Sequence, residues 1–271
     1  MKNIKLFILL VLTGSIFSCQ SGTEKQEWKT GIQTYSFHKF TLMETLDKAK
    51  DLGLDYAEAF FFQTLGTGFP DTAYLNYDMP EAQVKLLKEA FDKRDIKLYA
   101  FGVAYYGSDD EWKRFFAFAK EMGVHTVTCE PSLDQLDLVE KLALEHQIEV
   151  AIHNHPDPSV YADPAVLLKA LEGRSEIMGV CADIGHWLRT GHDPLETLKK
   201  FNGRIKVVHL KDLSRELEDT TWGTGILPVK EVLAELKSQH FTGLVSMEYE
   251  NFSDSQLDDM IKSLEFYKKH I

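Results

Sequence analysis

The sequence predicts a single-domain α/β protein, a closed (β/α)8 barrel, on three observations. Short β-branched or aromatic runs alternate with amphipathic helical stretches from Trp28 to the C-terminus. Eight strand–helix units follow one another without a break in composition, and such alternation is typical of a parallel sheet that closes into a barrel. No glycine-rich phosphate loop follows the first run, which argues against a doubly wound open sheet, the alternative architecture.

The expected strands and helices follow one another in strict order. The strands are residues 31–37, 54–62, 96–104, 124–130, 148–153, 177–183, 205–210 and 244–249. The helices are residues 41–52, 80–95, 109–122, 133–146, 163–173, 194–201, 229–239 and 253–270. In the first helix, Leu42 and Leu46 recur at helical spacing before Gly53, and Gly123 ends the third helix in the same way. Pro80 suits the first turn of the second helix, where a missing backbone N–H is tolerated.

Length, composition and net charge limit the classes of protein to which this chain can belong. The chain has 271 residues, 44% of them hydrophobic, which is enough for one large barrel or two smaller domains. The formal net charge of −12 argues against a nucleic-acid partner, because phosphate binding needs a basic face. Cys129 and Cys181 lie inside apolar runs without CxxC spacing, so we expect buried, unpaired thiols.

The first 21 residues are expected to be a targeting signal and not part of the fold. A basic start precedes an apolar run at residues 6–17, which is too short to span a bilayer. Cys19 then follows a small residue, a pattern that resembles a bacterial lipoprotein processing site; an ordinary secretory signal is the alternative. The first interpretation predicts an exported lipoprotein, periplasm-facing or anchored in the outer membrane. Its only membrane contact would be the lipid, and residues 22–271 would form the barrel.

Two expected connections exceed the usual length in barrels. Residues 63–79 and 213–227 both follow strands, on the face where barrel active sites are built. The first is rich in glycine and aromatic residues, which suits a lid or a sugar platform. A surface loop with its own small apolar cluster is the alternative.

Polar side chains gather where the expected strands end. They are Glu58, Glu130, His153, Asn154, His155, Asp183, His186, His209, Lys211, Glu248 and Glu250. The carboxyl ends of barrel strands converge on one axis, so these residues can share a site. One histidine there would more often be structural, but burying many carboxylates and imidazoles is costly unless a cation balances them. Mixed oxygen and nitrogen ligands suit Mn, Co, Mg or Zn, so the sequence predicts a divalent metal site.

The spacing of these residues resembles a known family. Asp183-x-x-His186, His209-x-Lys211-Asp212 and Glu248 are similar to the pattern of the xylose-isomerase-like TIM barrels. That superfamily holds sugar isomerases and epimerases, inosose dehydratases and endonuclease IV. The run Gly185-His186-Trp187-Leu188-Arg189-Thr190-Gly191 and the later Gly223-x-Gly225 resemble its bacterial sugar phosphate isomerase/epimerase branch. The resemblance covers Lys29 to the C-terminus.

The resemblance implies one divalent metal ion held by residues from strands five to eight. Asp183, His209 and Glu248 match three of the family's ligands. The first position falls near His153, where the epimerases have glutamate, so either His153 or Glu130 of the neighbouring strand supplies that ligand. Because one of the two metal-bound glutamates is missing, symmetric epimerisation is in doubt. Metal polarisation beside a base remains, which suits proton abstraction next to a carbonyl.

The remaining polar residues receive expected roles. The candidate acids and bases are His155, Lys211 and Glu250, although Lys211 could instead only pair with Asp212 or another carboxylate. The expected substrate contacts are His186, Glu58, Tyr35 and Trp222.

The leading functional prediction is a metal-dependent isomerase/epimerase-like enzyme acting on a non-phosphorylated sugar or keto-sugar. A 3-keto-glycoside lyase or hydratase and a non-catalytic sugar-binding lipoprotein are the alternatives. An activity like that of endonuclease IV would need a basic face, which the charge argues against. A small sugar is the expected partner, and a homo-oligomer is compatible with the sequence.

Overall fold

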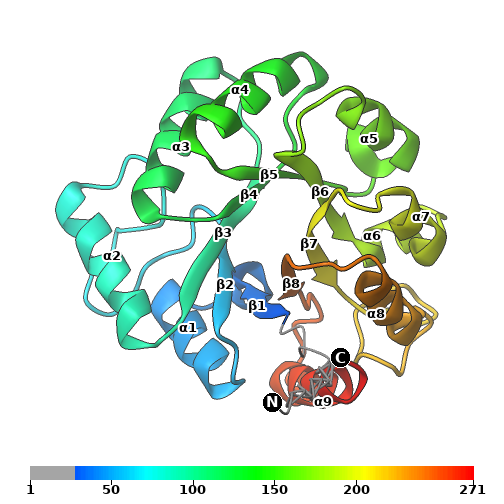
Figure 1. Ribbon diagram of the computed structural model, residues 1–271. Helices are drawn as coiled ribbons and strands as arrows, with labels where there is room; N and C mark the ends of the chain where they lie inside the picture. Colours follow the sequence, from blue (N-terminus) through cyan, green and yellow to red (C-terminus); the bar gives the residue numbers. More distant parts are fainter. Residues whose placement is uncertain (1–27) are drawn as a thin grey trace, which may run out of the picture.

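Eight parallel strands close into a barrel in the computed structural model, which describes residues 28–271, and helices form a ring around it (Figure 1). The strands are β1 Lys29–Gln33, β2 Tyr56–Ala59, β3 Lys97–Ala104, β4 Thr126–Cys129, β5 Glu149–His153, β6 Met178–Asp183, β7 Ile205–Leu210 and β8 Leu244–Met247. Each strand pairs with its neighbours in sequence, and β8 pairs with β1. The predicted (β/α)8 fold is therefore confirmed.

The α-helices follow the strands in the predicted order. They are α1 Leu42–Asp51, α2 Glu81–Lys93, α3 Asp109–Met122, α4 Leu136–His146, α5 Pro164–Leu171, α6 Ile184–Arg189, α7 Pro194–Lys200, α8 Val229–Ser238 and α9 Gln256–His270. Local sequence explains their ends. Thr41 and Ser108 begin α1 and α3 with capping boxes, and Gly123 ends α3 in the left-handed conformation at φ +75°.

Three differences from the expected elements have local causes. The first strand ends at Gln33, because its side chain accepts a hydrogen bond from the Tyr35 amide and starts a 3-10 turn, η1 Thr34–Phe37. The helix expected from residue 133 begins with another 3-10 turn, η2 Leu133–Gln135. Helix α6 was not expected; it begins directly after β6, where the Asp183 carboxylate accepts a hydrogen bond from the His186 amide.

The core has two parts. A large apolar cluster fills the space between the helices and the outer side of the barrel. A smaller cluster fills the barrel interior with Tyr99, Ala100, Ala151, Cys181, Val207 and Leu244. Above this plug, the register places Asp183 of β6 opposite His209 of β7, so polar groups from neighbouring strands reach the same height.

The connection at residues 63–79 has its own buried core. Leu65 and Leu75 are fully buried, and Thr64 pairs with Tyr74 in a short antiparallel bridge. The Leu42 amide at the start of α1 donates to the Thr64 carbonyl at 2.8 Å. These contacts favour the alternative of a packed surface loop over a lid.

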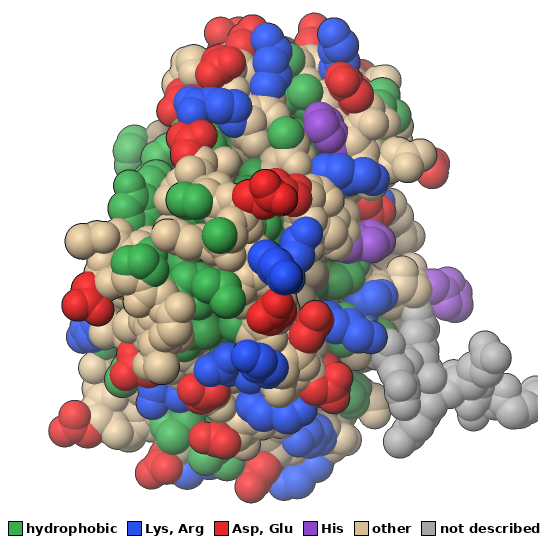
Figure 2. Space-filling model, turned by 90° about the vertical axis from the view of Figure 1, so that its left-hand side faces the viewer, with side chains coloured by type: hydrophobic (Ala, Val, Ile, Leu, Met, Phe, Trp, Pro, Cys, Tyr) green, Lys and Arg blue, Asp and Glu red, His purple; other side chains and the backbone are tan. Residues whose placement is uncertain are grey.

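On the face of the molecule shown in Figure 2, acidic and basic side chains are interspersed. Within residues 28–271 no helix combines the length and the apolar character that a membrane span requires. The predicted lipoprotein signal at residues 1–21 lies outside the described residues.

Candidate metal centre and active site

Four side chains bring ligand atoms together at the carboxyl ends of the last four strands. His153 ends β5, Asp183 ends β6, His209 belongs to β7 and Glu248 follows β8. One nitrogen or oxygen of each lies within 4.8 Å of the others. Asp183 Oδ2 lies 3.7 Å from His153 Nε2 and 3.9 Å from His209 Nδ1, and His209 Nδ1 lies 3.0 Å from Glu248 Oε2.

The same four atoms are left without hydrogen bonds. His153 Nε2, Asp183 Oδ2, His209 Nδ1 and Glu248 Oε2 are all buried and make no hydrogen bond with the described residues. The two carboxylate oxygens have an ion-pair partner instead, since Lys211 Nζ lies 3.2 Å from Asp183 Oδ2 and 3.0 Å from Glu248 Oε2. A buried polar atom without a hydrogen bond is costly, and the Lys211 contacts do not reach the two imidazole nitrogens, so one shared partner for all four atoms would suit this arrangement. Two imidazole nitrogens and two carboxylate oxygens form a donor set that suits a divalent ion. The cluster could therefore hold a metal.

Each imidazole of the cluster is held from behind by a carboxylate. His209 Nε2 lies 2.8 Å from Glu58 Oε2, and Glu58 Oε1 accepts a 2.5 Å hydrogen bond from Thr128 Oγ1. His153 Nδ1 lies 3.1 Å from Glu130 Oε1. Carboxylates in this position fix which nitrogen of a metal-binding histidine faces the ion.

This arrangement gives no support to two of the predicted roles. Glu58 is fully buried beneath His209, so it has no access to substrate. Glu130 is not among the four clustered residues, because its carboxylate is occupied by His153, by both the amide and the ring of His155, and by Ser159 Oγ at 2.7 Å. Burial opposes ionisation of Glu130, but hydrogen bonds from His153 and His155 outweigh it and hold its pKa well below the usual range.

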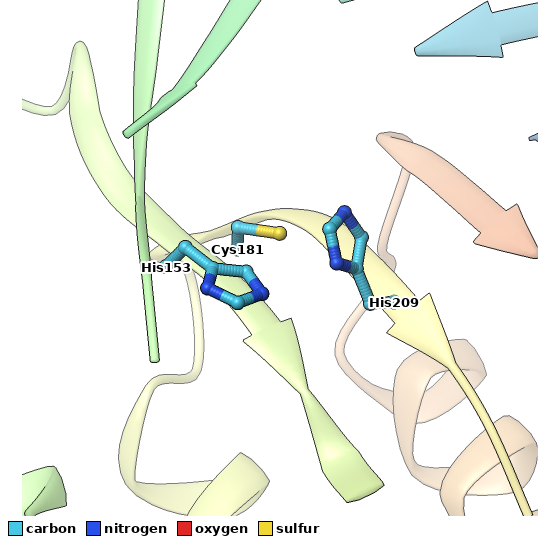
Figure 3. A group of neighbouring side chains, drawn as sticks. All are labelled: His153, Cys181 and His209. Atoms are coloured by element: carbon cyan, nitrogen blue, oxygen red, sulfur yellow. The ribbon is translucent and has the colours of Figure 1, made fainter. Parts of the chain in front are cut away.

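A thiol lies beside the two clustered imidazoles. Figure 3 shows Cys181 of β6 between His153 of β5 and His209 of β7, with all three side chains in the barrel interior. Burial raises the pKa of Cys181 to about 12, so it remains a protonated thiol at neutral pH. Cys129 and Cys181 are both buried and unpaired, as predicted.

Lys211 is an ammonium group buried among carboxylates. Its Nζ lies 2.5 Å from Glu250 Oε2, 3.0 Å from Glu248 Oε2 and 3.2 Å from Asp183 Oδ2. Burial alone would lower the pKa of Lys211, but Asp183, Glu248 and Glu250 raise it well above the ordinary value. Lys211 therefore stays charged, which suits a counter-ion better than the predicted base.

Asp212 does not pair with Lys211; it organises the long connection after β7. Its carboxylate accepts hydrogen bonds from the amides of Leu213, Gly223, Gly225 and Leu227 at 2.8 to 3.0 Å. A Cβ atom on Gly225 would lie 2.3 Å from Asp212 Oδ1, so no other residue fits there. The close approach of this carboxylate explains the glycine at position 225.

His186 lies next to the four-atom cluster. Its Nε2 is 3.4 Å from Asp183 Oδ2, and its Nδ1 is 3.1 Å from Arg189 Nη1. Burial lowers the pKa of His186 to about 2, so the ring is neutral. Arg189 is held in turn by Asp219, whose Oδ2 lies 3.1 Å from Nη2. Neither Arg189 nor Asp219 had an expected role: Arg189 lies within the run of residues 185–191 that resembles the family, and a loop aspartate gives no signal of its own.

A cavity of about 470 Å³ opens beside the cluster. Its lining residues are Gln33, Tyr35, Phe60, Phe61, Phe62, Gly102, Val103, Ala104, Tyr105, Tyr106, His155, Glu248 and Glu250. The lining thus combines aromatic side chains with two carboxylates and an imidazole. No lysine or arginine is among these lining residues.

The cavity includes some predicted substrate contacts and not others. Tyr35 lines it, as do the predicted acid–base residues His155 and Glu250. Trp222 does not: it is 1% exposed, and its ring packs against Tyr267 of α9. The position of Trp222 thus gives no support to the predicted substrate contact.

A second cavity of about 290 Å³ lies at the opposite end of the barrel, around His125 and Glu149. Its charged groups pair with one another, for example Lys206 Nζ with Glu149 Oε1 at 2.7 Å. The groups of ligand residues that could hold a metal, found among the described residues, do not include His125 or Glu149. The cavity beside the four-atom cluster is the candidate active site.

Comparisons with known proteins agree with this geometry. The sequence model of the family described as xylose isomerase-like TIM barrel matches residues 46–270. A solved protein from Parabacteroides distasonis ATCC 8503 is 58% identical, over 89% of this chain and 98% of that one, with a TM-score of 0.76.

Two more distant relatives have names that state an activity or a bound metal. Inosose dehydratase 2 of Bacillus cereus is 28% identical over 139 residues, 45% of this chain and 47% of that protein. The chain thus matches about half the length of this curated relative. The IOLI protein, solved with a bound zinc atom, is 16% identical over 90% of this chain and 99% of that one. Its TM-score of 0.71 indicates a shared fold.

Proposed function

Because the chain belongs to the xylose isomerase-like TIM barrel family, we propose that it is a metal-dependent enzyme that moves a proton next to a carbonyl group of a sugar or keto-sugar. The observation that carries this proposal is the cluster of four buried ligand atoms without hydrogen bonds. A sugar-binding protein without catalysis would not need such a costly arrangement.

We assign one divalent ion to His153, Asp183, His209 and Glu248. His153 is preferred over Glu130 as the first of the four ligands. The buried atom without a hydrogen bond is His153 Nε2, whereas the Glu130 carboxylate contacts the other nitrogen of the same ring, Nδ1. Such an ion polarises carbonyl and hydroxyl oxygens and lowers the cost of negative charge on them.

Proton transfer is assigned to His155 and Glu250. Both line the cavity, and neither is one of the four clustered ligands. Lys211 Nζ donates a hydrogen bond to Glu250 Oε2 at 2.5 Å, which fixes the position of this carboxylate at the cavity. His155 is bonded through Nδ1 to Glu130, so Nε2 is its ring nitrogen available to substrate.

The cavity favours a substrate without phosphate. Phosphate recognition uses arginine, lysine or clusters of amides, whereas this lining has carboxylates and no cationic side chain. Tyr35, Phe62 and Tyr105 are aromatic lining residues that keep 39%, 67% and 74% of their surface exposed. Exposed aromatic faces suit the apolar face of a sugar ring, and a 470 Å³ cavity lies in the range of small-molecule sites.

Isomerisation or epimerisation and elimination both begin with this proton transfer. Elimination is the second candidate, as a dehydratase, lyase or hydratase acting on a keto-sugar or 3-keto-glycoside. It is favoured by the imidazole of His153 in place of a carboxylate, because fewer carboxylates are then left for a symmetric transfer between two faces. The inosose dehydratase relative supports the same candidate, although it is matched over only about half its length.

We also propose where in the cell the protein acts. The segment at residues 1–21 supports export as a lipoprotein, with the lipid on Cys19. Labelling cells with a fatty acid should mark the wild-type protein and leave a Cys19→Ser variant unmarked. An equally labelled variant would refute the anchor without touching the enzymatic proposal.

Turnover is tested with a panel of keto-sugars and glycosides, each with Mn²⁺, with Co²⁺ and after chelation. We expect turnover only with metal, and NMR of products formed in D₂O should find deuterium next to the carbonyl carbon. The position of the deuterium and the loss or retention of water separate epimerisation from elimination. Turnover that survives chelation, or products without solvent deuterium, would contradict the proposal.

A further inference from the structure

Arg189 connects His186 to the long loop after β7 through separate nitrogen atoms. Nη1 lies 3.1 Å from His186 Nδ1, Nη2 lies 3.1 Å from Asp219 Oδ2, and Nε donates to the Leu217 carbonyl at 3.2 Å. The side chain is only 20% exposed. Three acceptors in three directions fix the plane of the guanidinium group.

This contact determines where the proton of His186 is. A guanidinium group is always charged and only donates hydrogen bonds, so the atom it meets must accept. His186 Nδ1 is therefore unprotonated, and a neutral imidazole must then carry its single proton on Nε2. Nε2 lies 3.4 Å from Asp183 Oδ2, so the N–H is on the side of the four-atom cluster.

We propose that Arg189 is a positioning residue that fixes His186 as its Nε2–H tautomer and so makes His186 a hydrogen-bond donor to a substrate oxygen beside the metal ligands. The donor role rests on the proposed function; the tautomer does not. A ring fixed in this way cannot accept a proton at Nε2 from substrate. It stabilises negative charge that develops on a substrate oxygen, while other groups move the proton.

The same contact gives the loop at residues 213–227 a role. Leu217 and Asp219 of this loop hold Arg189, and Asp212 holds the loop through four amide hydrogen bonds. The chain of contacts runs from the backbone of the loop to one ring nitrogen. If Arg189 only tied α6 to the loop, its replacement would change stability and leave the tautomer unaltered.

The test is ¹⁵N NMR of the full chain with labelled histidine, recorded without metal and with Zn²⁺. A His186→Gln variant assigns the signals. We expect wild-type His186 to show an unprotonated Nδ1 and a protonated Nε2 in both samples. In Arg189→Met the two nitrogen shifts should move toward each other as the tautomers mix, and Arg189→Lys should keep the wild-type pattern because an ammonium group also only donates. Arg94→Met, at an ion pair with Asp47 on the helical layer, is the matched control and should leave His186 unaltered.

A protonated Nδ1 in the wild-type protein would overturn the proposal, whether or not any variant folds. So would unchanged His186 shifts in a folded Arg189→Met protein. Neither outcome depends on finding a substrate, so the tautomer can fail while the enzymatic proposal stands, and the reverse also holds.

Discussion

Replacement of Glu58 by glutamine tests how the barrel orients the imidazoles of the proposed metal site. Glu58 and His209 are both fully buried, with 2.8 Å between Oε2 and Nε2, and the other oxygen of Glu58 is held by Thr128. Glutamine keeps the volume and one acceptor but removes the charge. Loss of such a carboxylate behind a metal-binding histidine weakens metal affinity about 10- to 100-fold. That corresponds to about 1.4 to 2.8 kcal/mol of binding free energy.

The assay is titration of the metal-free protein with Zn²⁺ in competition with a chelating dye. The matched control is Glu149→Gln, because Glu149 also lies beside a histidine, 3.6 Å from His125 Nδ1, but at the opposite end of the barrel. We expect Glu58→Gln to lose affinity and Glu149→Gln to bind as the wild type does. Equal affinity of Glu58→Gln and wild type would refute the carboxylate's role, and equal losses in both variants would show a general effect of charge.

Other substitutions separate the parts of the site. His153→Ala should abolish metal binding, whereas Glu130→Gln should only weaken it about 10- to 100-fold; the reverse order in the same titration would make Glu130 the ligand. Asp212→Ala leaves four loop amides without an acceptor and should lower the free energy of unfolding by about 3 to 5 kcal/mol in urea denaturation, and a loss below about 1 kcal/mol would contradict this. Burial raises the pKa of Asp219 to about 6, so the folded state binds this proton more tightly than the unfolded chain. The stabilising contribution is thus present at low pH and lost as pH rises through about 6, and the unfolding free energy of wild type should fall relative to Asp219→Asn between about pH 4 and pH 7.

The sequence predicted the barrel well because each of its signals is local. Apolar runs and caps such as the Thr41 and Ser108 boxes act within a few residues, and eight repeats leave few architectures. The same logic brought Asp183, His209 and Glu248 to one rim, since strand ends in a barrel converge.

What the sequence left open depends on contacts across the barrel. Whether His153 or Glu130 faces the cluster depends on side-chain direction at the ends of adjacent strands, which periodicity describes only as facing in or out. Glu58 was taken for a substrate contact because a carboxylate at a strand end gives no sign of its partner 151 residues away. The packing of Trp222 could not be predicted for a related reason: in a long loop, an aromatic residue packs against whichever helix the loop crosses, here α9.

The central claim is that His153, Asp183, His209 and Glu248 hold one divalent ion. Anomalous diffraction at the manganese edge, from crystals of the Mn²⁺-loaded protein, tests this most directly. We predict a single strong peak within bonding distance of these four side chains, and its absence from crystals of an Asp183→Asn variant. No peak, or a peak bound instead through Glu130 or Cys181, would contradict the account.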